Sequence, residues 1–180
     1  MPNHVFNEVR LHGVSLEKVT PLISREDVPI DFSVLLPMPI NYWRHSQSVL
    51  HEKGFPGSWY EWNRENWGTK WNAYGFDQGG RYESVSTDER DTVLRFQTAW
   101  STPRGWLCAM FNTLNCQITV EYLDEGSVNG GRETFTPEKS EKMCDEARWG
   151  TEEIPEGTDE HRRLHKLLWG VEEFTENDDD

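Results

Sequence analysis

The sequence predicts an α+β fold in which two helices cover one face of an antiparallel sheet. Several segments alternate apolar and polar residues, as half-buried strands do, and two others carry apolar residues at helical spacing. The two kinds of segment follow one another as strand, helix, strand, strand, helix, strand, which is typical of this class. With 180 residues the chain can form one domain with an appendage, or two small domains.

The first strand and helix are predicted at the N-terminus. Residues 4–12 place apolar side chains mostly on one side, so they predict a half-buried strand that ends at Gly13. Residues 15–24 carry one apolar helical face behind Ser15, a suitable N-cap. The run PIDFSVLLPMPINYW that follows is predicted to be an extended segment leading out of the regular fold.

A helical insertion is predicted at 37–68, before the second core strand. Its clearest helix has Ser58 as the N-cap, Glu61 three residues later as the partner in a capping box, and Gly68 as the stop signal. Residues 69–74, TKWNAY, then alternate and predict a strand.

The second half of the domain repeats the pattern. Residues 91–101, DTVLRFQTAWS, alternate most regularly of all, and Thr102 as a hydroxyl cap with Pro103 in the first turn predicts the start of the second helix. Residues 116–126 predict another strand, followed by a glycine-containing hairpin that returns to Phe135. Two βαβ-like halves with both helices on one face form the ferredoxin-like arrangement.

The domain organisation follows from a change in composition. Residues 1–136 are predicted to be the ferredoxin-like domain, with the inserted helical segment 37–68, and residues 137–180 to be an acidic, partly helical C-terminal extension. The extension carries 15 of the 32 acidic residues and one amphipathic segment, 159–174. We therefore expect a chain cut after Phe135 to remain folded.

Composition restricts the partners and the location. The net charge of -14 disfavours direct binding to nucleic acid, because an acidic surface repels phosphates. The absence of a long apolar run predicts no membrane span, and the N-terminus lacks the pattern of a secretory signal. The cysteines, Cys108, Cys116 and Cys144, are predicted to be buried thiols, which suits a cytoplasmic location.

Five motifs occur in one order: PNHVFNEVRLHG, LLPMP, NWGTKWNAY, FQTAWSTP and YLDEG. This set resembles the YubB-type, phage-associated ferredoxin-like family carried on plasmids, prophages and genomic islands. The resemblance covers roughly the first three quarters of the chain, consistent with one domain of ordinary size. It implies a fold and a genomic setting. The family has no established activity, so no catalytic residue is implied.

No motif predicts a metal, a cofactor or a nucleophile. The sequence contains no CxxC, HExxH, GxSxG, P-loop or GxGxxG pattern. His161 and His165 are four residues apart on the predicted C-terminal helix, but two ligands do not make a zinc site, and we expect both to lie on the surface. The expectation is a protein with no catalytic residues and no cofactor.

Tryptophan is the unusual feature of the sequence, with nine residues. Trp59, Trp62, Trp67, Trp71 and Trp100 cannot all be exposed without large apolar patches, so most of them, Trp71 included, are expected in the core. A cleft between the insertion and the sheet is the alternative. Its candidate binding residues are Glu61, Arg64, Trp67, Lys70, Asn72, Arg95, Trp100 and Arg104.

Three functional hypotheses remain open. The favoured one is a non-enzymatic accessory protein of a mobile genetic element that binds a host or element-encoded protein, since Trp and Arg dominate protein–protein hot spots. A small enzyme with its site in the Trp-lined cleft is the second, but no pair of titratable groups with opposed environments is evident. A DNA mimic acting through the acidic extension is the third.

Overall fold

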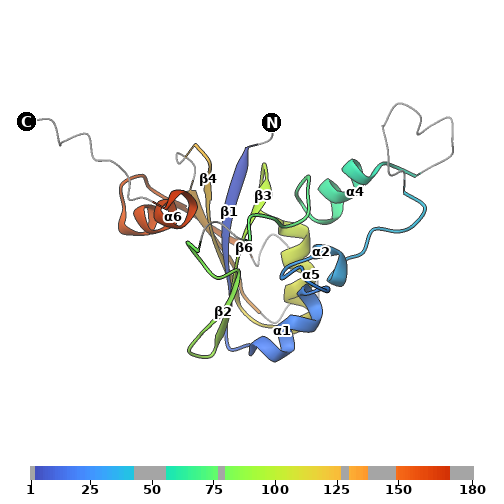
Figure 1. Ribbon diagram of the computed structural model, residues 1–180, viewed down its shortest axis with the longest axis horizontal. Coiled ribbons are helices and arrows are strands. Elements are labelled where there is room, and N and C mark those ends of the chain that lie inside the picture. The colour runs from blue at the N-terminus through green and yellow to red at the C-terminus, as the bar shows by residue number, and fades with distance from the viewer. Residues whose placement is uncertain (1–2, 43–55, 77–79, 127–129, 138–148, 171–180) are drawn as a thin grey trace, which may run out of the picture.

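The computed structural model describes residues 3–42, 56–76, 80–126, 130–137 and 149–170 (Figure 1). They form one six-stranded antiparallel sheet with the strand order β2-β3-β1-β4-β5-β6. The strands are β1 His4–Leu11, β2 Val85–Asp88, β3 Asp91–Ala99, β4 Ile118–Asp124, β5 Gly130–Phe135 and β6 Trp149–Ile154. The first four have the spatial order of a ferredoxin-like sheet, and β5 and β6 extend it beyond β4.

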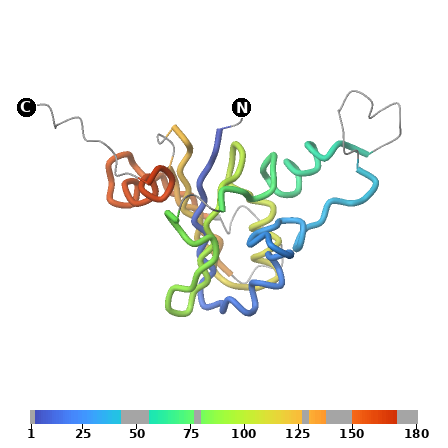
Figure 2. Tube along the Cα trace, viewed as in Figure 1, coloured from blue at the N-terminus to red at the C-terminus, as the bar shows by residue number. Residues whose placement is uncertain are grey.

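The helices lie on two sides of this sheet, as Figures 1 and 2 show. Four of them, on one side, are α1 Leu16–Ile23, α2 Phe32–Leu35, α4 Trp59–Asn66 and α5 Arg104–Leu114. The fifth, α6 Asp159–Trp169, lies on the other side, next to the end of β4. The predicted α+β architecture, with α1 and α5 on one face, is confirmed.

The alternation in β1 produces two cores. Val9 and Leu11 point into the main core with residues of α1 and α5. Phe6 points the other way and is fully buried with Leu164 and Leu168 of α6. The apolar residue that interrupts the polar side of this strand therefore marks the place where α6 docks.

Residues 69–74 do not form the predicted second strand; the prediction is wrong, and β2 lies further along the chain. Only Tyr74 pairs with β3, through an isolated bridge to Gln97. The Asn72 side chain explains the difference, because its Oδ1 accepts from the backbone N–H groups of Phe32 (2.8 Å) and Ala73 (2.8 Å). These bonds from the backbone to a side chain take the place of a strand ladder.

Two further local predictions are wrong for the same kind of reason. The segment expected to be extended contains the short helix α2, because Asp31 caps it by accepting from the Ser33 N–H at 2.8 Å. Thr102 does not cap α5. The N-cap is Pro103, which has no side-chain hydrogen bond, and the Thr102 hydroxyl faces Glu133 instead.

The insertion is seated on α5 by a close approach of two backbones. The Trp67 carbonyl accepts from the N–H groups of Gly105 (3.1 Å) and Trp106 (3.3 Å), which supplies the acceptor that the missing cap would have provided. A Cβ on Gly105 would lie 2.0 Å from the Asn66 carbonyl oxygen. Gly68 has a φ of +86°, so a glycine is needed on both sides of this contact.

The tryptophans divide between core and surface. Trp62, Trp67 and Trp106 are buried, and the Trp67 indole N–H donates to the Leu36 carbonyl at 2.9 Å. Trp71 is 37% exposed and Trp100 is 45% exposed, so the expectation that Trp71 belongs to the core is wrong. Trp71 follows the insertion on an irregular segment, where alternation does not report burial.

Residues 149–169, assigned to the extension from the sequence, continue the sheet and cover it. Strand β6 pairs with β5 over its whole length, from Gly130 opposite Ile154 to Phe135 opposite Trp149. Helix α6 ends at Gly170, which has a φ of +78°. The remainder of the predicted helix 159–174 lies outside the described residues. No described helix combines the length and apolar character needed to cross a membrane.

Candidate functional site

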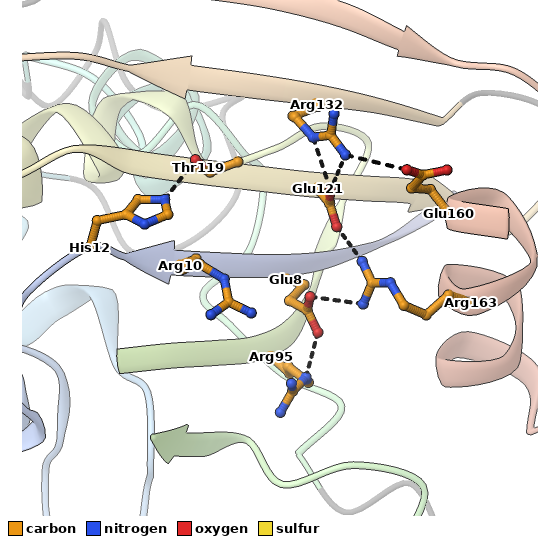
Figure 3. Close-up of a pocket in the computed structure, with 9 residues that line it drawn as sticks. All are labelled: Glu8, Arg10, His12, Arg95, Thr119, Glu121, Arg132, Glu160 and Arg163. Atoms are coloured by element: carbon orange, nitrogen blue, oxygen red, sulfur yellow. Dashed lines mark hydrogen bonds and ion pairs between the residues drawn. The ribbon is translucent and has the colours of Figure 1, made fainter. Parts of the chain in front are cut away.

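A hollow of about 470 Å³ lies on the face of the sheet that carries α6, and we call it the Arg–Glu pocket (Figure 3). Its floor comes from β1, β3, β4 and β5, and one wall comes from α6. The lining residues are Glu8, Arg10, His12, Arg95, Thr119, Glu121, Arg132, Glu160 and Arg163. Four guanidinium groups in one pocket suggest anion binding at first sight.

The carboxylates of the pocket already occupy these guanidinium groups. Glu8 accepts from Arg95 Nε at 2.6 Å and from Arg163 Nη1 at 2.8 Å. Glu121 accepts from Arg132 Nη2 at 2.6 Å and also pairs with Arg163. Figure 3 shows Arg163 reaching from α6 to both carboxylates. Arg163 thus links α6 to the two central strands.

The outer end of the pocket is neutralised in the same way. Arg10 Nη1 lies 2.6 Å from Asp88 Oδ2 and 3.5 Å from Asp91 Oδ2. The Gly13 N–H, and then the charges of His12 and Arg10, hold the pKa of Asp91 below its usual value, although burial opposes this. The Arg–Glu pocket is therefore a set of ion pairs that holds α6 on the sheet, rather than a cluster of free cations.

A second hollow of about 470 Å³ lies on the opposite face, beside the connection from β3 to α5, and we call it the Trp100 hollow. It is lined by Val5, Gly68, Trp100, Ser101, Thr102, Arg104, Tyr122, Asp124 and Glu133. The Glu133 side chain is 2% exposed and accepts from Arg104 Nη2 at 2.6 Å. Burial raises the pKa of Tyr122, as do the charges of Glu133 and Glu153, although Arg104 opposes this.

A group of aromatic and basic side chains adjoins this hollow. The Lys70 ammonium lies 4.8 Å from the ring centre of Trp100, 5.1 Å from that of Trp71 and 5.9 Å from that of Tyr60. The Arg64 guanidinium lies 5.5 Å from the Tyr60 ring centre. We call these five residues the Lys70 surface. The distances are within the range of cation–π contacts, which hold both cations in place.

The backbone fixes the Lys70 surface from both sides. The Thr69 hydroxyl donates to the Ala99 carbonyl at 2.7 Å, and the Ser101 hydroxyl donates to the Gly68 carbonyl at 2.7 Å. These two bonds join the end of the insertion to the end of β3. Trp100 lies between them with a φ of +77°. A bulky residue rarely adopts this conformation, and such strain gathers at functional sites.

Comparison with known families now places the chain. Residues 67–167 match the family described as "Ferredoxin-like domain in Api92-like protein". The chain belongs to this family. In this Api92-like chain the matched residues run from the end of α4 to near the end of α6, so they include β2 to β6, α5 and most of α6, whereas β1, α1 and α2 precede the match. No curated protein and no solved structure matches the chain.

The Api92-like domain brings together only part of the predicted cleft. Arg64, Lys70 and Trp100 belong to the Lys70 surface, and Arg104 lines the Trp100 hollow beside it. The other four predicted residues lie elsewhere or have structural roles, and they are Glu61, Trp67, Asn72 and Arg95.

Each of these four has a definite place. Glu61 completes the predicted capping box, which is confirmed, by accepting from the Ser58 N–H at 2.8 Å. Trp67 is buried in the main core and Asn72 holds the backbone of α2. Arg95 lies in the Arg–Glu pocket on the opposite face of the sheet, because alternation along β3 turns it away from the insertion.

Sequence reasoning missed Tyr60 and misplaced Trp71. Tyr60 lies one helical turn before Arg64, and the Arg64 Nη1 donates to its hydroxyl at 3.3 Å. The spacing of four residues on a predicted helix was the signal for this pair. Trp71 carried no comparable signal, because its exposure depends on how the segment after Gly68 crosses β3.

The surroundings of the cysteines confirm one expectation and correct another. Cys116 is a buried free thiol, as predicted, and burial raises its pKa to about 11. Cys108, which is half-buried on α5, is disulfide-bonded, so the prediction of a buried thiol there is wrong. Cys144 lies outside the described residues.

The predicted surface position of His161 is wrong as well. It is fully buried, because it belongs to the stripe of α6 that also carries Leu164 and Leu168. His165 lies beside it, with the ring centres 6.4 Å apart. In the part of the chain that the structure describes, no group of three or more His, Cys, Asp or Glu residues could hold a metal ion.

Proposed function

We propose that this Api92-like protein is a non-enzymatic protein-binding module, whose partner docks on the Lys70 surface and in the Trp100 hollow. The observation that carries the proposal is the exposure of two indoles, 37% for Trp71 and 45% for Trp100, which both contact Lys70 and of which Trp100 also lines a hollow. Exposed indoles beside a concavity favour protein recognition, because Trp, Tyr and Arg dominate interface hot spots.

The fixed geometry of the surface supports binding. The bonds from the Thr69 and Ser101 hydroxyls to backbone carbonyls and the cation–π contacts of Lys70 hold the indoles before any partner arrives. A partner therefore has less side-chain freedom to remove on docking, and a preorganised surface binds more tightly for that reason.

The chemistry of the hollow favours binding over catalysis. A general acid or base needs a carboxyl or similar group that can exchange a proton with a substrate. Glu133, the buried carboxylate of the hollow, is already held by Arg104 and Thr102. The small-enzyme hypothesis is therefore the weaker alternative. For the DNA mimic, the acidic residues 171–180 lie outside the described part of the chain.

The proposal includes a biological setting. The resemblance of five motifs to the YubB-type family supports an accessory role in a phage, plasmid or genomic island, with a host or element-encoded protein as the partner. A cytoplasmic location is part of the same proposal. The free Cys116 supports it and the Cys108 disulfide opposes it, since disulfides are rare in that compartment. Thiol blocking in intact cells, followed by mass spectrometry of the Cys108 peptide, distinguishes the two.

The experiment that tests the binding proposal is affinity purification from the native host with matched Trp variants. We expect a protein that co-purifies with the native chain and is lost with Trp100→Ala, because truncating a hot-spot Trp costs about 2 kcal/mol or more of binding free energy. Trp169→Ala is the control, because Trp169 is 47% exposed on α6, on the other side of the sheet.

Two outcomes contradict the proposal. One is a partner that binds equally well to the native chain and to Trp100→Ala, which would place the interface elsewhere. The other is co-purification of a small metabolite without any protein, which would favour the enzyme.

A further inference from the structure

We infer that the Lys70 surface recognises an acidic peptide segment of the partner, with carboxylates that pair with Arg64 and Lys70 and an apolar side chain that packs on Trp71 and Trp100. The inference rests on the proposed function and adds the chemistry of the partner. Its starting point is an exception in the charge pairing of this protein.

Basic residues on the sheet and on the helices beside it are neutralised by acids. Arg10, Arg95, Arg132 and Arg163 each form at least one ion pair with a carboxylate at 2.8 Å or less. Arg104 is paired with Glu133 in the same way. In a chain with a net charge of -14, acids to pair with are abundant. Unpaired cations that gather in one place are therefore unusual here.

Arg64 and Lys70 are such cations. Within the described ranges neither forms an ion pair with a carboxylate; their contacts are with the rings of Tyr60, Trp71 and Trp100 and with the Tyr60 hydroxyl. Rings hold a cation in place without neutralising its charge. The two positive charges thus remain available to an incoming acid.

The nearest acids in the sequence leave this charge in place. The Glu61 side chain turns toward the start of α4, where its Oε2 accepts hydrogen bonds from the Ser58 N–H at 2.8 Å and from the Ser58 hydroxyl at 3.1 Å. Glu65 is exposed on α4 and forms no ion pair with its neighbour Arg64 among the contacts of the described chain. The adjoining hollow is lined by Asp124 and by the paired Arg104 and Glu133.

The range of electrostatic forces favours a short acidic segment over a nucleic acid. At physiological salt the screening length is about 8 Å, so a ligand that touches only the Lys70 surface responds mainly to Arg64 and Lys70. A single-stranded nucleic acid could also stack on these rings. Its backbone would continue past them onto the rest of a chain with a net charge of -14, where each further phosphate is repelled.

Fluorescence anisotropy with three labelled probes tests the inference. The probes are a short peptide of Asp and Glu with one central Leu, the same peptide with Lys in place of the acids, and an oligothymidylate of similar length. We expect the native chain to bind the acidic peptide most tightly of the three, and to bind it more weakly as salt is added.

Charge reversal locates the site. The double variant Arg64→Glu/Lys70→Glu should weaken binding of the acidic peptide by roughly ten-fold or more, since two favourable ion pairs become repulsions. Lys18→Glu/Arg90→Glu is the charge-matched control, because Lys18 is exposed on α1 and Arg90 on the turn between β2 and β3, and both elements lie away from α4 in Figure 1; it should leave the affinity unchanged. Lys70→Met keeps the apolar stem of the side chain. If it binds the acidic peptide more weakly at an unchanged melting temperature, the weaker binding results from the lost charge.

The inference is overturned if the native chain does not bind the acidic peptide at low salt, if it binds the basic peptide or the oligothymidylate more tightly, or if the double variant binds as well as the control. Its failure is distinct from that of the proposed function. A co-purifying partner that is lost with Trp100→Ala but kept by Arg64→Glu/Lys70→Glu would retain the binding module and reject the acidic segment.

Discussion

Individual tryptophans in this domain have different roles because their surroundings differ, and the sequence shows only part of that difference. Trp62 and Trp106 occur at apolar positions of helical stripes, so their burial follows from periodicity. Trp71 and Trp100 lie where regular structure ends. Their exposure is set by the Thr69 and Ser101 hydroxyl bonds, which join segments about thirty residues apart and leave no local pattern.

Replacement of two of these indoles should separate core from surface. Trp106→Ala should lower the free energy of unfolding by about 3–5 kcal/mol, because the ring is fully buried against Phe32 and Phe96. Trp71→Ala should lower it less, by about 1–2 kcal/mol, since Trp71 is 37% exposed and lies outside the main core. Urea denaturation of both variants checks this. A loss of unfolding free energy for Trp71→Ala as large as that for Trp106→Ala would show that Trp71 contributes to the core.

A glycine at the seat of the insertion offers a second residue-scale test. Gly105→Ala should destabilise the protein by about 1–3 kcal/mol or more, because its Cβ would fall 2.0 Å from the Asn66 carbonyl oxygen and both partners are backbone. Gly150→Ala in β6 is the control, with no atom within 4 Å of the new Cβ. Equal melting temperatures for the two variants would mean that the insertion can move away from α5 at little cost.

At the scale of elements, helix α6 shows what the sequence could and could not predict. Its apolar stripe, from Leu164 to Leu168, predicts an amphipathic helix, and the helix forms as expected up to Gly170. Its docking place was not predictable, because it depends on Phe6, which is 158 positions before Leu164, and on Arg163 reaching Glu8 and Glu121. Strand β6 was missed because WGTEEI is too polar to resemble a buried strand.

The ion pairs of Arg163 should contribute measurably to the docking of α6. Arg163→Met removes one partner from two largely buried carboxylates and should cost about 1–3 kcal/mol of folding free energy. Arg162→Met, the matched control, loses only an exposed pair with Asp159 at 3.1 Å and should cost less than about 0.5 kcal/mol. Thermal melts of both variants test this; similar values would show that the apolar contacts alone hold α6.

At the scale of the whole molecule, the order of strands and helices was more predictable than the exact position of each one. The order of alternating segments and helices was sufficient for a ferredoxin-like sheet, because β1, β3, α5 and β4 each have a strong local pattern. The second core strand was predicted at 69–74 but is β2 Val85–Asp88, since Asn72 uses its side chain where a ladder was expected. Part of the candidate site could be proposed from the sequence, since composition pointed to Lys70 and Trp100. Arg95 was assigned to the same site although it lies on the other face of the sheet, and only the strand register shows which face that is.

Truncation tests how far the domain extends. The sequence alone predicts that a chain ending at Phe135 stays folded. The contacts now lead us to expect the reverse, because this cut would expose Phe6 and Leu123 and leave Glu8 and Glu121 without Arg163. The family match to residues 67–167 continues across the cut, which points the same way.

A matched chain ending at Gly170 keeps every described element, so it should unfold cooperatively at the same temperature as the full chain. The chain ending at Phe135 should lose its cooperative melt by circular dichroism and bind a hydrophobic dye, because one side of its sheet has lost its cover. A cooperative melt of the shorter chain, at an unchanged temperature, would show instead that α6 and β6 are an appendage to a sheet that is stable without them.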